Sequence, residues 1–72
     1  MKYYIVDGVG ADEFWSAPYS TPEEATEAAE SEFKHLSAHD QKRRSYFYVA
    51  GVEESADGEE DRENYDIIAK IK

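Results

Sequence analysis

The pattern of apolar and polar positions predicts a strand, a helix and two further strands in this chain. Residues 2–7 are expected to form the first strand, because Tyr3, Tyr4, Ile5 and Val6 favour extended backbone and glycines follow them. Residues 8–20 are expected to be a connection, and its aromatic side chains need a place to pack at one end of the core. These aromatic residues are Phe14, Trp15 and Tyr19.

The strongest local signal is the start of a helix at Thr21-Pro22-Glu23-Glu24. Thr21 can accept a hydrogen bond from the third helical amide, Pro22 suits the first helical position, and Glu24 can reach back to the Thr21 amide. An apolar face then recurs at helical spacing, formed by Ala25, Ala28, Ala29, Phe33 and Leu36. The opposite, solvated side carries a stripe of Glu23, Glu27 and Glu30, with Lys34 placed to pair with Glu30.

The second half of the chain predicts a short helical turn and two strands. Ser37 is a second helix cap, so the first helix is expected to end near Leu36 and a turn of helix to span Gln41–Arg44. Residues 46–52 are a strand in which Phe47 and Val49 face the core, while the alternating tyrosines face the other side. Residues 65–72 fit a strand or a helix, and the strand is favoured.

These elements predict a single α+β domain over residues 1–72 with β-α-β-β order. The sheet is expected to be three-stranded and mainly antiparallel, with the Thr21–Leu36 helix packed on one face. Residues 53–64 hold seven carboxylates around an Asp57-Gly58 turn dipeptide and are expected to be an exposed acidic loop.

Charge and composition narrow the classes of function. A net charge of −9 opposes direct binding to nucleic acid, because such affinity comes from cationic side chains, so a basic protein partner is expected. Without cysteine there is no disulfide scaffold or thiolate chemistry, and a reducing cytoplasm is the expected compartment. The first residues do not form a signal peptide, and no apolar stretch approaches the roughly 20 residues of a membrane span.

The candidate chemical motifs are weak. His35 and His39 have metal-ligand spacing, but a helix break at Ser37 separates them and no third ligand follows. The alternating acids from Asp57 resemble the start of a calcium loop, yet the required glycine and final glutamate are replaced by Arg62 and Ile68. With no nucleophile motif or phosphate-binding glycine loop, we expect no enzyme, no cofactor and no metal site.

Two sets of residues are candidates for binding a partner. Spaced carboxylates can imitate a phosphate backbone and occupy a cationic channel. This acidic set comprises Glu23, Glu27, Glu30, Glu59, Glu60 and Asp61. The second set is aromatic and comprises Trp15, Tyr19 and the outward tyrosines, for which affinity would hardly respond to salt.

Two alternatives stand beside these sets. A homo-oligomer or accessory structural protein, paired through an exposed sheet edge, is the alternative function. A solvated acidic surface that serves solubility is the plainest interpretation of the charge. The cations Lys42, Arg43 and Arg44 are too few to bind nucleic acid against the net charge of −9.

An ordered series of motifs also suggests a setting. The chain opens with Tyr-Tyr-Ile-Val-Asp and continues with Tyr-Ser-Thr-Pro-Glu-Glu-Ala, Leu36-Ser37, Gln-Lys-Arg-Arg and Tyr-Phe-Tyr-Val. In this it resembles small acidic proteins of phages and mobile elements in gut Firmicutes. The resemblance implies an accessory protein that binds host or element proteins, including inhibitors of nucleases such as CRISPR effectors. It assigns no functional residue.

Overall fold

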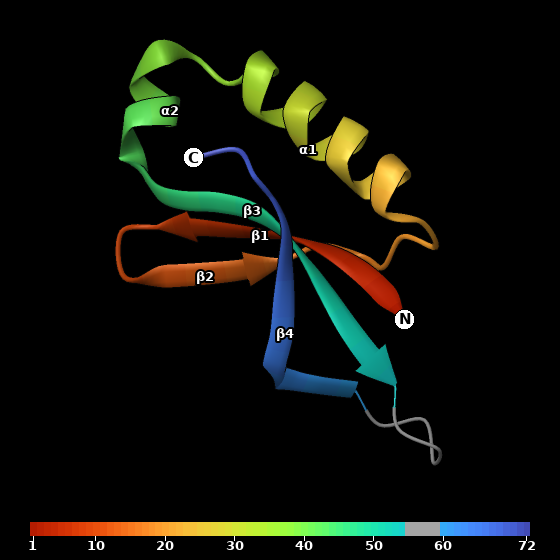
Figure 1. Ribbon diagram of the computed structural model, residues 1–72. Helices are drawn as coiled ribbons and strands as arrows, with labels where there is room; N and C mark the ends of the chain where they lie inside the picture. Colours follow the sequence, from red (N-terminus) through yellow and green to blue (C-terminus); the bar gives the residue numbers. More distant parts are fainter. Residues whose placement is uncertain (55–59) are drawn as a thin grey trace.

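The described part of the backbone forms a four-stranded antiparallel sheet with α1 packed against one face (Figure 1). The computed structural model describes the backbone of residues 1–54 and 60–72 and the side chains of residues 1–53 and 64–72. In chain order the elements are β1 (Lys2–Val9), β2 (Asp12–Trp15), α1 (Pro22–His35), α2 (Ala38–Arg43), β3 (Arg44–Glu54) and β4 (Glu60–Lys70). Across the sheet the strand order is β2-β1-β3-β4.

The α+β class, with a helix on an antiparallel sheet, is confirmed, but the expected three strands are wrong. The additional strand, β2, lies inside residues 8–20, which were expected to be a connection. Asp12 and Glu13 are poor strand formers by composition. Gly10, with φ of 60°, reverses the chain, and β1 then pairs Val6 with Trp15. A neighbouring strand therefore holds β2 extended, which local composition does not reveal.

The start of α1 follows the predicted capping chemistry. The Thr21 side chain accepts a hydrogen bond from the Glu24 amide at 3.2 Å, and Pro22 opens the helix. On the sheet side, Ala25 and Ala29 are fully buried, and their small side chains let the helix lie close to the strands. Helix α2 begins at Ala38, earlier than the expected Gln41, because the Ser37 hydroxyl caps the Asp40 amide directly at 3.1 Å.

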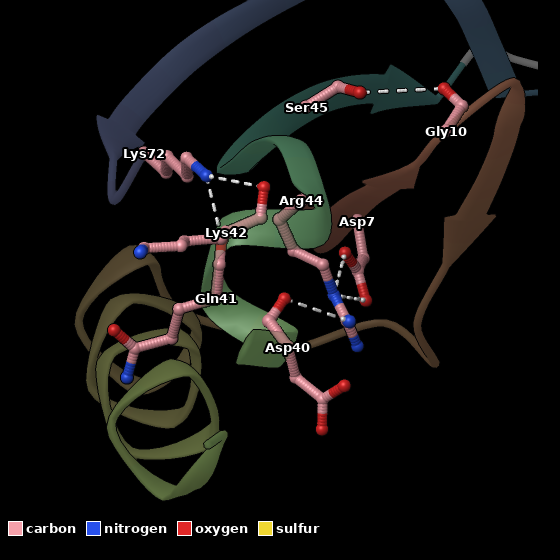
Figure 2. Close-up of polar contacts among 8 residues, drawn as sticks. All are labelled: Asp7, Gly10, Asp40, Gln41, Lys42, Arg44, Ser45 and Lys72. Atoms are coloured by element: carbon pink, nitrogen blue, oxygen red, sulfur yellow. Dashed lines mark hydrogen bonds and ion pairs between the residues drawn. The ribbon is translucent and has the colours of Figure 1, made fainter. Parts of the chain in front are cut away.

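A polar network fixes α2 to the sheet and to Lys72, which follows β4 (Figure 2). The Arg44 guanidinium donates to both oxygens of Asp7 on β1, at 3.0 and 3.3 Å, and to the Asp40 carbonyl. Lys72 donates to the Gln41 carbonyl at 2.6 Å, at the C-terminal end of α2. Cations placed on helix-terminal carbonyls are electrostatically favourable there. Arg44, one of the predicted cationic cluster, is therefore engaged in holding the fold.

Both faces of the sheet carry buried side chains. On the helix side, Ile5, Phe47 and Val49 pack with the alanines of α1. On the other face, Val6 and Ala50 are fully buried beside Tyr48. The predicted alternation of Phe47 and Val49 with the β3 tyrosines is confirmed.

The C-terminal half of the sheet is longer than expected. For residues 65–72 a strand was favoured over a helix, and β4 confirms the strand for residues 65–70, where Ile67 pairs with Ala50 and Ala69 with Val49. Strand β3 continues to Glu54 and β4 begins at Glu60, so the acidic loop expected over 53–64 is too long. Pairing between the two strands extends into that segment, and residues 55–59 lie outside the described residues.

Replacing Thr21 with alanine should lower the free energy of unfolding by about 1 kcal/mol, because it removes the cap of α1. Urea unfolding followed by circular dichroism measures the change. Ser20→Ala is the matched control, since Ser20 is exposed and its side chain bonds to no described residue. Equal losses in both variants would contradict the capping role.

Candidate functional site

Three of the predicted acidic residues line one hollow between α1 and β4. Glu23, Glu27 and Glu30 face this hollow, which has a volume of about 510 Å³. Pro22 and Thr26 of the helix and Ile68 of β4 complete its lining. We refer to these six residues as the acidic groove. The structure thus brings together residues that the sequence placed on one stripe of a helix.

Local structure explains why these carboxylates point outward. Residues 23, 27 and 30 are separated by four and three positions, so they share one side of an α-helix. Ala25 and Ala29 are buried in the core, so the side of α1 that carries the glutamates faces outward. All three glutamates are exposed.

The carboxylates of the groove are electrostatically unsatisfied within the protein. None of the three has an ion-pair or hydrogen-bond partner in the described part of the structure. The expected pair between Glu30 and Lys34 is not formed among these described side chains. Like charges at this spacing destabilise a helix by a few tenths of a kcal/mol per pair. A cationic partner in the groove would relieve that repulsion.

The side chains of the remaining acidic candidates fall outside the described part of the structure. Glu60 and Asp61 are the first two residues of strand β4, but their side chains lie outside the described residues. Glu59 lies outside them altogether. The described groove therefore rests on the helical glutamates.

The two aromatic candidates lie on opposite faces of the sheet. Tyr19 forms a bridge with Tyr3 and packs into the helix-side core. Trp15 packs on the other face with Val6 and Tyr48. A single partner surface containing both residues is therefore not formed. Phe14, expected to cover the core, is instead 58% exposed.

The face opposite α1 carries a connected set of rings, which we call the aromatic face: Tyr4, Trp15, Tyr46, Tyr48 and Tyr65. Trp15 meets Tyr4 and Tyr65 edge-on, with centroid distances of 5.6 and 5.8 Å. Tyr65 stacks on Tyr48 at 5.9 Å, and the Tyr48 hydroxyl donates to that of Tyr65 at 2.8 Å. Edge-on and offset contacts at these distances are favourable for aromatic pairs.

Glu13 accepts hydrogen bonds from two members of the aromatic face. Trp15 donates through Nε1 to Oε1 at 2.6 Å, and the Tyr46 hydroxyl donates to Oε2. These bonds, that from Tyr46 above all, hold the pKa of Glu13 below its ordinary value. The same bond raises the pKa of Tyr46 to about 12. Burial, followed by the bond to Tyr65, raises the pKa of Tyr48.

Two residues of these sites carried no recognisable signal in the sequence. Ile68 enters the groove because a register shift in β4 directs it there. Glu13 lies in the missed strand β2, where pairing with Gly8 places it beside Tyr46. A Cβ on Gly8 would lie 2.4 Å from the Tyr46 ring, so this glycine makes room for the ring.

The cationic residues gather at the opposite end of α1. Lys42 and Lys72 line a second hollow of about 370 Å³ with Phe33, Ala38, Gln41 and Ile71. Lys72 is bonded to carbonyls of α2, and Arg44 to Asp7. His35 contacts the Ser31 carbonyl through Nδ1 at 2.6 Å. Lys72 and Arg44 thus bond to carbonyls of α2, which gives these two cations a structural role.

Stability should fall as pH rises above about 10. In the unfolded chain tyrosine ionises near pH 10, whereas Tyr46 in the folded protein keeps its proton until about pH 12. The contribution of Tyr46 to the free energy of unfolding is therefore complete below pH 10 and is lost by about pH 12. In Tyr46→Phe, urea midpoints should decline less between these values. Tyr19→Phe, whose hydroxyl bonds to no described residue, should follow the wild type. Identical pH profiles for Tyr46→Phe and wild type would contradict the role of the bond to Glu13.

Searches for other kinds of site and for related proteins gave no further assignment. Among the described side chains, no three histidines or carboxylates lie close enough together to hold a metal ion. No helix in the described ranges is long and apolar enough to cross a membrane. Comparisons of the chain with protein families, with curated proteins and with solved structures found no match.

Proposed function

We propose that this protein is a non-enzymatic binding module whose acidic groove holds a basic surface of another protein. The observation that carries the proposal is the arrangement of Glu23, Glu27 and Glu30. They line one hollow, are exposed, and have no cationic partner among the described residues. A net charge of −9 adds a long-range attraction for a basic partner.

The spacing of the carboxylates supports competition with nucleic acid. Along a helix that rises 1.5 Å per residue, residues 23, 27 and 30 lie about 6 and 4.5 Å apart. Successive phosphates of one DNA strand advance about 3.4 Å along the duplex axis, so the carboxylates repeat at a spacing of the same order but somewhat wider. A channel built for phosphates would therefore meet negative charges at intervals it can accept. In the setting suggested by the phage-protein resemblance, this activity would be inhibition of a host nucleic-acid enzyme.

The structure also bears on a self-associating role. Strand β4 forms one edge of the sheet, and its pairing with β3 has two register shifts. Irregularities of this kind are a common protection against edge-to-edge pairing. Strand β2, at the other edge, spans Asp12–Trp15 and offers a short template. These two edges therefore disfavour a homo-oligomer that is paired edge to edge.

Reversing the charge of the three groove residues should abolish capture of the partner. The experiment is a tagged pull-down from a nuclease-treated lysate of a Gram-positive gut bacterium, washed at low and high salt and read by mass spectrometry. Wild type should retain a basic nucleic-acid enzyme at low salt and lose it at high salt. Glu23→Lys/Glu27→Lys/Glu30→Lys should not retain it.

A control with the same change of net charge separates the groove from overall charge. Asp12, Glu32 and Glu53 are exposed carboxylates outside the groove, and Asp12→Lys/Glu32→Lys/Glu53→Lys should still capture the partner. The captured enzyme should be inhibited by wild type, and DNA should compete with that inhibition. Capture that survives in the groove variant, or is lost equally in both, would refute this proposal.

A further inference from the structure

Strand β4 contributes an isoleucine to the acidic groove through a bulge. Ala69 pairs with Val49 and Ile67 with Ala50, so Ile68 is an extra residue in the ladder between β3 and β4. A bulge lets a strand present two successive side chains on one side and is a known way to redirect a side chain. Here Ala69 packs into the helix-side core, and Ile68 lines the groove next to it.

The inner part of Ile68 is held by contact with β3. Gly51 of β3, which pairs with Asp66, has no side chain, and a Cβ there would lie 3.1 Å from Cδ1 and 3.3 Å from Cγ1 of Ile68. Gly51 therefore provides the space in which Ile68 sits. The isoleucine nevertheless remains 40% exposed, at the surface that Glu23, Glu27 and Glu30 share.

The neighbouring isoleucine provides a contrast. Ile67 is 60% exposed and pairs with Ala50, whose side chain belongs to the cluster on the face opposite α1. The two isoleucines thus lie on opposite sides of the same strand. Only Ile68 of the pair lines the groove.

We infer that the acidic groove recognises a basic protein segment that carries an apolar side chain between its lysine or arginine residues. This rests on the proposed function and adds the form of the partner. The three glutamates pair with the cations of the segment. Its apolar side chain lies on Ile68, against Pro22 and the methyl group of Thr26, and is withdrawn from water. A second copy of this chain is disfavoured as the occupant, because it would bring a net charge of −9 to an acidic surface.

Recognition of this kind has two components that respond differently to salt. The pairing of charges weakens as ionic strength rises, whereas contact between apolar side chains does not. A partner bound through charge alone would lose nearly all of its affinity in high salt. In high salt the inferred partner should keep the part of its affinity that comes from contact between its apolar residue and Ile68.

The experiment uses two fluorescent peptides, each with a central residue between pairs of lysines. The centre is leucine in one peptide and serine in the other, and binding is followed by fluorescence anisotropy at low and high salt. Wild type should bind the leucine peptide about tenfold more tightly, since burying about 55 Å² of apolar surface corresponds to that ratio. Ile68→Ser should abolish the preference. Ile67→Ser, the matched control on the other side of β4, should keep it.

The outcomes separate this inference from the proposed function. Equal affinity of wild type for the two peptides, or loss of the preference in Ile67→Ser as well, would overturn the role of Ile68 while leaving binding through charge intact. If neither peptide binds at low salt, or if Glu23→Lys/Glu27→Lys/Glu30→Lys binds as wild type does, both proposals fail. A concentration-dependent rise in mass by sedimentation, lost in Ile68→Ser, would instead identify a second copy as the occupant and overturn the inferred partner.

Discussion

Contact between the rings of Trp15 and Tyr65 closes the face of the sheet that α1 does not cover. The two residues belong to β2 and β4, the strands at opposite edges of the sheet. Their large side chains reach toward each other above the inner strands, where Val6, Ala50 and Val52 are fully buried. Within the described ranges α1 is the one long helix, and it covers one face of the sheet, while aromatic side chains cover the other. The buried cluster of Val6, Tyr48 and Ala50 on this face depends on that cover.

The same arrangement determines which residues remain for function. Tyr48 and Trp15 are engaged in ring contacts and hydrogen bonds, and Tyr19 is packed beside the helix-side core. Arg44 and Lys72, among the cations, hold α2. The helical glutamates differ from these, since they contribute no described contact to the fold. The acidic groove is therefore a part of the described surface whose carboxylates the fold itself does not use.

What could be predicted from the sequence was local. The start of α1 was accessible because its cap, its proline and its acidic first turn lie within a few consecutive residues. The glutamate stripe followed from helical periodicity alone. Strand β2 was missed because pairing with β1, rather than its own composition, makes it extended. Ile68 was missed for a similar reason, because a bulge is defined by the register of two strands that are distant in sequence. The sequence grouped Trp15 and Tyr19 as one candidate set, whereas the structure places them on opposite faces of the sheet. A sequence does not show on which face of a sheet a connecting segment packs.

Repulsion between the glutamates of α1 lowers the stability of the helix slightly, and their interaction with the helix dipole offsets only part of this loss. Glu23 and Glu24 occupy the first turn, where the positive end of the helix dipole favours carboxylates. That benefit fades beyond the first turn, so Glu27 and Glu30 gain little from it while repelling Glu23 and each other. Lys34 is suitably spaced to offset Glu30, yet the described structure leaves the two apart. Stability alone would favour side chains of alternating charge at these positions, a pattern that exposed helix faces commonly show. Under the proposed function, a basic protein segment in the groove would supply the missing opposite charge, and its binding energy would include the repulsion that it removes.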